Sequence, residues 1–74
     1  MSEILDIREI RKFSDEKLQD EFEDQKESLF NLRFQKAAGQ LEDVNAIPRT
    51  RRHIARLLMV IRERQLAAEK SNQE

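Results

Sequence analysis

Cysteine, tryptophan and tyrosine are absent from this chain of 74 residues, and glycine and proline occur once each. Without cysteine the protein has neither a disulfide nor a thiolate metal site. Its single histidine, His53, argues against a zinc site as well. The shortage of glycine and proline, combined with many Glu, Lys, Arg, Leu, Gln and Ala residues, favours long helices over strands.

Long apolar runs are missing too. No window approaches the roughly 20 apolar residues of a membrane span, and the N-terminal Met1-Ser2-Glu3 does not begin a signal peptide. We therefore expect a soluble, cytoplasmic protein. At this length we expect one small domain, whose core supplies no more than about 3–5 kcal/mol of net stability. The fold must be very regular, or a partner must help to hold it.

Charge is nearly balanced overall but unevenly spread. Residues 1–44 contain 12 acidic and 7 basic residues, a net charge of -5, whereas residues 45–74 contain 3 acidic and 7 basic residues, a net charge of +4. The split indicates a basic surface on an otherwise acidic molecule. The alternative is that opposite charges simply pair between two helices.

Local signals predict the helix boundaries of an all-α fold. A short helix is expected over residues 6–12, with Asp6 as its N-cap. Ser14 then caps a long helix over residues 15–38, and Gly39 suits the left-handed position just past its end. Phe13 and Leu18 have the spacing of a hydrophobic staple around this cap.

A second long helix is expected over residues 46–67. Pro48 is tolerable only in a first turn, so the regular start lies between Asn45, a plausible N-cap, and Pro48. The helical-hairpin domain then covers residues 1–68, and residues 69–74 form a polar, disordered tail.

Apolar stripes on the two long helices predict how they pair. The first stripe consists of Leu18, Phe22, Leu29 and Leu32, and the second of Ile47, Ile54, Leu57, Leu58 and Ile61. Gln25 and Lys36 interrupt the first stripe, which indicates imperfect packing or splayed helix ends. A short connector makes the helices an antiparallel hairpin, with the N-terminal segment folded across its open end.

The outward faces carry arginine, amide and aromatic side chains. On the second helix Arg49, Arg52 and Arg56 lie opposite the core stripe, with Arg51 on a flank and Met59, Val60 and His53 beside the basic face. On the first helix Asn31, Phe34 and Gln35 face away from the core, and Phe30 lies to the side. A solvated arginine face and edge packing of the phenylalanines are the simple alternatives. Together these residue types suit an RNA surface, because arginine binds phosphate in a bidentate manner and aromatic rings stack on bases. His53 is expected to be solvated or adjacent to RNA.

Signals of catalysis are lacking. The sequence has no nucleophile–base pair, no phosphate-binding glycine loop and no cluster of metal ligands. The acidic residues of the first helix are expected to form a solvated face. We expect neither enzymatic activity nor a cofactor.

Two segments carry a resemblance to a known family. Leu29-Phe30-Asn31-Leu32-Arg33-Phe34-Gln35 is followed by Gly39-Gln40-Leu41, and later by Arg51-Arg52-His53-Ile54-Ala55-Arg56. Over about residues 9–66 the chain resembles the bacterial form of large-subunit ribosomal protein number twenty-nine. The resemblance implies two long antiparallel helices with a short N-terminal one, and a monomer within the ribosome. It also implies binding to large-subunit rRNA near the nascent-chain tunnel exit.

Partners and site residues follow from the same resemblance. The neighbouring protein would be the twenty-third of the large subunit, and trigger factor and the signal recognition particle would dock at the shared rim. The outward-facing residues and the family motif together give the expected RNA-binding set: Asn31, Arg33, Phe34, Gln35, Gly39, Gln40, Arg49, Arg51, Arg52 and Arg56.

Two other classes of function stay open from the sequence. The first is an interaction module in which Phe30, Phe34, Met59 and Val60 join two hairpins into a four-helix bundle. The second is a small all-helical enzyme resembling a chorismate mutase dimer, for which the chain is short and its arginines face outward.

Overall fold

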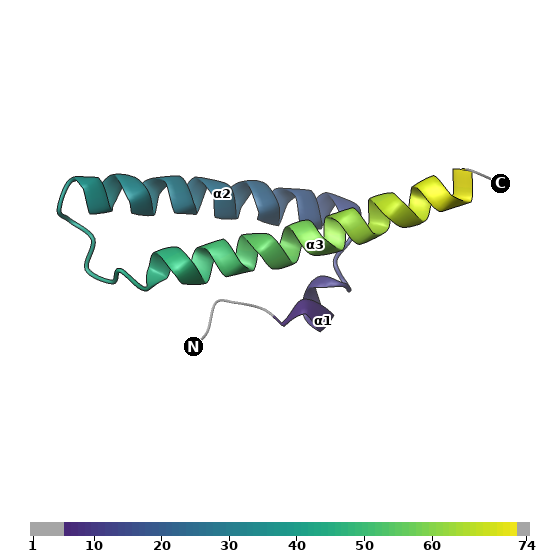
Figure 1. The fold of residues 1–74 in the computed structure, drawn as a ribbon, viewed down its shortest axis with the longest axis horizontal. Helices are drawn as coiled ribbons and strands as arrows, with labels where there is room; N and C mark the ends of the chain where they lie inside the picture. Colours follow the sequence, from purple (N-terminus) through teal and green to yellow (C-terminus); the bar gives the residue numbers. More distant parts are fainter. Residues whose placement is uncertain (1–5, 73–74) are drawn as a thin grey trace.

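Three helices make up the fold, and no strand occurs in residues 6–72, the part that the computed structural model describes. They are α1 (Ile7–Ile10), α2 (Asp15–Ala37) and α3 (Ala46–Asn72). Helices α2 and α3 form an antiparallel hairpin, and α1 packs on α3 near the open end (Figure 1). The predicted all-α hairpin with a short N-terminal helix is confirmed.

The N-caps predicted at Asp6 and Ser14 are formed. The Asp6 carboxylate accepts a hydrogen bond from the backbone N–H of Arg8 at 3.2 Å, and the Ser14 hydroxyl accepts one from the N–H of Lys17 at 3.1 Å. These bonds satisfy N–H groups that have no partner within the first turn of a helix. The chain between the two caps turns sharply, so α1 folds back against the hairpin instead of continuing into α2 (Figure 1).

Helix α2 ends as its glycine predicts. Gly39 has φ +72°, and its N–H donates to the Lys36 carbonyl at 3.1 Å. The Gln40 N–H donates to the Gln35 carbonyl at 2.8 Å. This pair of bonds is a Schellman motif, which satisfies the last carbonyls of the helix and turns the chain toward α3.

The start of α3 also falls in the predicted interval. The helix begins at Ala46, so Pro48 lies in the first turn, where its missing N–H costs no hydrogen bond. Asp43 organises the approach, because its carboxylate accepts from the Asn45 N–H at 3.0 Å and from the Arg49 guanidinium at 2.6 Å. These two bonds hold the pKa of Asp43 below its usual range, the Arg49 bond having the larger effect.

Helix α3 is longer than expected. It continues to Asn72, beyond the expected end near residue 67, so residues 69–72 are helical where we expected the start of a disordered tail. Ala67, Ala68, Glu69 and Lys70 are strong helix formers and are exposed, so helix propensity accounts for the extension. The rest of the expected tail, residues 73–74, lies outside the described residues.

The core lies where the three helices meet. Four side chains are almost fully buried, and partly buried apolar residues surround them. The four are Ile10, Leu18, Leu57 and Val60, and the surrounding residues are Ile7, Phe13, Phe22 and Ile61. The expected outward position of Val60 is wrong: the side chain is 1% exposed, because it packs with Ile10 of α1. The four-helix-bundle alternative thereby loses one of its proposed interface residues.

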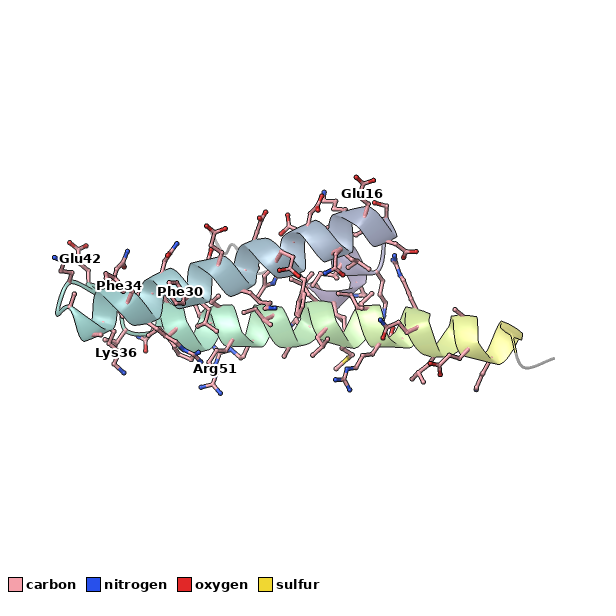
Figure 2. All side chains as sticks on the ribbon, turned by 90° about the horizontal axis from the view of Figure 1, so that it is seen from above. Glu16, Phe30, Phe34, Lys36, Glu42 and Arg51 are labelled. Atoms are coloured by element: carbon pink, nitrogen blue, oxygen red, sulfur yellow. The ribbon has the colours of Figure 1, made fainter. Side chains whose placement is uncertain are left out.

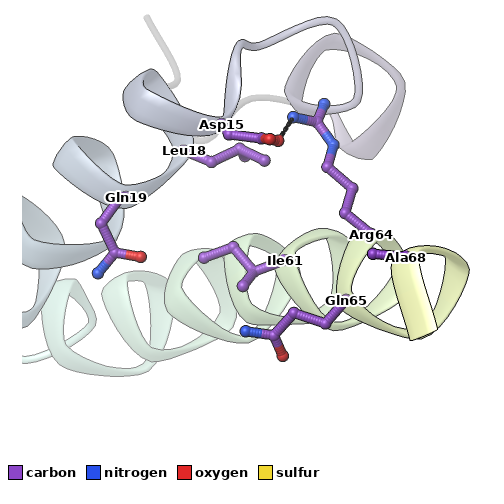
Figure 3. A pocket seen from close by; sticks show the side chains of 7 residues that line it. All are labelled: Asp15, Leu18, Gln19, Ile61, Arg64, Gln65 and Ala68. Atoms are coloured by element: carbon purple, nitrogen blue, oxygen red, sulfur yellow. Dashed lines mark hydrogen bonds and ion pairs between the residues drawn. The ribbon is translucent and has the colours of Figure 1, made fainter. Parts of the chain in front are cut away.

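Arg64 ties the open end of the hairpin together, a role that the sequence did not indicate. Its guanidinium donates to the carboxylate of Asp15 at 2.6 Å (Figure 3). It also donates to the backbone carbonyls of Arg11 at 3.0 Å and Phe13 at 2.6 Å. A second bond between α3 and the N-terminal region runs from Arg11 to Glu63 at 2.9 Å. The residues between α1 and α2 are thus fastened to α3.

Candidate nucleic-acid interface

The loop-side half of α2 presents polar and aromatic groups to solvent. Asn31, Arg33 and Gln35 are exposed, and the side chains of Phe30 and Phe34 are 69% and 68% exposed. Edge packing within the hairpin therefore does not account for these two rings. Exposed phenylalanines one turn apart, with an arginine between them in sequence, are suited to stacking on unpaired bases.

The facing half of α3 adds positive charge. Arg51 and Arg52 are exposed, and no carboxylate of residues 6–70 comes within 4.0 Å of either guanidinium. Lys36 of α2 is likewise exposed and free of a described carboxylate partner. Lys36 and Arg51 project to the same side of the hairpin near its loop, whereas Glu16 lies on the other side at the far end of α2 (Figure 2).

Lys36 is a residue that the predicted set omits. Periodicity places Lys36 on the apolar stripe of α2, which it interrupts. The structure leaves Lys36 exposed, so this end of the stripe is not buried. Its exposure could have been predicted from the sequence, because a lysine on an apolar stripe near a helix end cannot bury its charge without a partner. The loop-side cations are therefore Arg33, Lys36, Arg51 and Arg52.

Ion pairs between the helices are confined to the opposite end of the molecule. The described pairs that join elements far apart in sequence are Arg11–Glu63 at 2.9 Å and Arg64–Asp15 at 2.6 Å. Neither involves a loop-side cation. Charge pairing between helices consequently explains the basic residues near the open end and not those near the loop.

Three members of the predicted RNA-binding set have structural roles of their own. Arg49 is half exposed and held by Asp43, whose carboxylate competes with any phosphate for the guanidinium. Gly39 and Gln40 form the turn after α2 through their backbone N–H groups. All three lie at the surface beside the loop, so a role in contact and a role in shaping the turn are compatible.

Arg56 and His53 differ from the expectation. Arg56 is only partly exposed, and its Nη1 atom is buried without a described hydrogen-bond partner. His53 is 3% exposed rather than solvated, and its Nδ1 atom also lacks a described partner. His53 lies on the same side of α3 as Leu57 and Val60 by helical spacing, and a projection of two helices alone leaves that side open.

The hollows between the helices are unlike active sites. The groove in Figure 3, about 290 Å³, is lined by Leu18 and Ile61 with glutamines and the Asp15–Arg64 pair around them. No group of three or more His, Asp or Glu side chains capable of holding a metal ion occurs among the described residues. Within the same part of the chain, every helix is too short or too polar to cross a membrane.

At one end of a small helical hairpin, exposed aromatic rings lie near cations that have no described carboxylate partner, which is a surface suited to binding. A sequence profile of the family described as "Ribosomal L29 protein" matches residues 8–64. The chain is 48% identical over 59 residues to large ribosomal subunit protein uL29 of Persephonella marina, covering 80% of this chain and 87% of the relative. It is 46% identical over 66 residues to the proteins of that name from Staphylococcus aureus and Staphylococcus carnosus, covering 89% of this chain and 96% of each relative.

The chain belongs to the ribosomal L29 protein family. The resemblance inferred from the two sequence segments is thereby confirmed. Because these relatives are ribosomal proteins and not enzymes, the expectation that this chain is not an enzyme is confirmed as well.

Proposed function

We propose that this protein is a structural constituent of the large ribosomal subunit and that it binds large-subunit rRNA through the loop half of the hairpin. The relatives' names support the assignment to the subunit. The observation that carries the RNA contact is the set of exposed cations without described carboxylate partners, Arg33, Lys36, Arg51 and Arg52, beside the exposed Phe30 and Phe34.

In the proposed contact, arginines neutralise RNA phosphates and the rigid hairpin fixes the spacing between them. Arginine donors lie at the surface of two helices that the core and the Arg64 bonds hold in fixed relation, so they meet crowded phosphates with little ordering cost. Each arginine–phosphate contact releases counterions, and losing one flattens the logarithmic salt dependence of binding by about 0.7–0.9. The RNA-contact set expected from the sequence is retained, and Lys36 is added to it. Arg56 stays in the set although its side chain is only partly exposed.

The position within the subunit is the finer part of the proposal. Family resemblance supports a location near the nascent-chain tunnel exit, beside the twenty-third large-subunit protein. There the acidic side of α2 would be left to face protein partners, among them trigger factor and the signal recognition particle. Glu16 lies on a different side from Lys36 and Arg51, which agrees with an RNA-facing side and a separate protein-facing side (Figure 2).

Two charge reversals test the assignment of the RNA-facing side. Arg52→Glu places a carboxylate against phosphate, and we expect it to be incorporated into large subunits about tenfold less well than the wild type, since a charge-assisted hydrogen bond contributes about 1.5–3 kcal/mol. Glu23→Lys is the control, a charge reversal of the same size and opposite sign on an exposed residue of α2. The measurement is the ratio of tagged variant to untagged wild-type protein in purified subunits. Equal incorporation of the two variants contradicts the assignment.

A further inference from the structure

A buried histidine lies on the side of α3 that carries α1. His53 is 3% exposed, and its Nδ1 atom is buried without a described hydrogen-bond partner. His53, Leu57 and Val60 follow each other at helical spacing along one stripe, and Ile10 of α1 packs in the same cluster as Leu57 and Val60. The imidazole therefore continues the buried stripe on which α1 is seated.

Two charged side chains influence this imidazole, Arg56 of α3 and Glu21 of α2. Arg56 is on the same helix, three residues on, and its own Nη1 atom is buried without a described partner. The Glu21 carboxylate of α2 interacts electrostatically with His53, and Asp6, the N-cap of α1, interacts electrostatically with Arg56. A proton on His53 would put a second cation beside the Arg56 guanidinium in a poorly solvated place. Such an arrangement disfavours the docked state, in which α1 packs on α3 and His53 is buried.

Burial therefore lowers the pKa of His53 below its ordinary value of 6.5, Glu21 partly opposes the shift, and Arg56 adds to it. The docked form holds the neutral imidazole, whereas a released form with His53 in water takes up a proton near the ordinary value. Docking is accordingly at full strength above about pH 6.5 and weakens as the pH falls below it.

We propose that α1 is a proton-sensitive cover on α3, which protonation of His53 releases. The change carries one proton, so the docking equilibrium falls by up to about tenfold for each pH unit below 6.5 until the docked form also protonates. The carboxylates that help to hold α1 in place keep their charge in this pH range. Asp6 and Glu63 have pKa values lowered from 3.8 and 4.5 by their bonds with Arg8 and Arg11, so they lose their charge only in stronger acid.

The test uses the full chain, labelled with nitrogen-15, between about pH 5 and 7.5, the range in which histidine is the side chain that titrates. Two quantities are followed by NMR: the ring signals of His53, and the hydrogen-exchange protection of the Arg11 and Phe13 amides, which donate to Ile7 and Ile10. Protection is corrected for the intrinsic pH dependence of exchange. We expect protection of these two amides to fall with pH by up to about tenfold per unit, while amides in the middle of α2 stay constant.

His53→Gln is the decisive variant, because glutamine is polar and stays neutral throughout the range. It should keep α1 protection level across the range. Identical profiles for this variant and the wild type, or a His53 ring that titrates at or above 6.5 in the wild type, overturn the proposal. Glu21→Gln is the second variant, should His53→Gln not fold. By removing the carboxylate that favours the protonated imidazole, it lowers the affinity of the docked form for a proton, so docking should fall with pH at least as steeply as in the wild type; a shallower fall contradicts the mechanism.

Discussion

Replacing Arg64 with methionine should remove much of the stability of this small domain. The guanidinium makes three hydrogen bonds, two to backbone carbonyls and one to Asp15, and the side chain is 33% exposed. Hydrogen bonds from a charged donor contribute about 1.5–3 kcal/mol each when well shielded, but the Asp15 carboxylate is 87% exposed and its ion pair contributes under about 1 kcal/mol. Allowing for this exposure, we expect Arg64→Met to cost about 2 kcal/mol.

Urea denaturation followed by circular dichroism measures the effect. Methionine retains the apolar stem of arginine, so the loss reports mainly on the guanidinium bonds. With a slope of about 1 kcal/mol per molar urea for a protein of this size, the midpoint should fall by about 2 M, against a total stability of about 3–5 kcal/mol. Arg62→Met is the matched control, because Arg62 is exposed and has no described carboxylate partner; it should change stability by less than about 0.5 kcal/mol. Equal midpoints for the two variants would refute the role assigned to Arg64.

Two further substitutions test the turn and the core. Gly39→Ala should cost about 1–2 kcal/mol by thermal or urea unfolding, since Gly39 has φ +72° while an added Cβ meets no atom within 4 Å; an unchanged midpoint would contradict the strain argument. Leu57→Ala should cost about 2–5 kcal/mol, because its side chain is 0% exposed, whereas Leu66→Ala, at a position 60% exposed, should stay within about 0.5 kcal/mol. Similar losses for the two leucine variants would show that the core lies elsewhere.

Features set by neighbouring residues could be predicted from the sequence. The caps at Asp6 and Ser14, the turn at Gly39 and the position of Pro48 in a first turn each depend on backbone groups within a few residues. The exposure of Arg52 also follows from helical periodicity, since this position lies opposite the apolar stripe of α3.

Features set by long-range contacts could not be predicted in this way. Periodicity shows which face of a helix is apolar, but it does not show that a four-residue helix packs on a second face, and so it does not predict the burial of Val60. Arg64 and Arg49 look like surface arginines in sequence. Their partners become visible only when the fold brings the Phe13 carbonyl and the Asp43 carboxylate beside them.

The central claim is that this hairpin is an integral RNA-bound part of the large ribosomal subunit. The most direct measurement is sedimentation of a tagged copy with ribosomal subunits through a gradient that contains high salt, which removes loosely held proteins. The account predicts retention with the large subunit at one copy per particle. A protein that stays at the top of the gradient, above all as a dimer, would contradict the account and favour a hairpin that associates through its exposed phenylalanines.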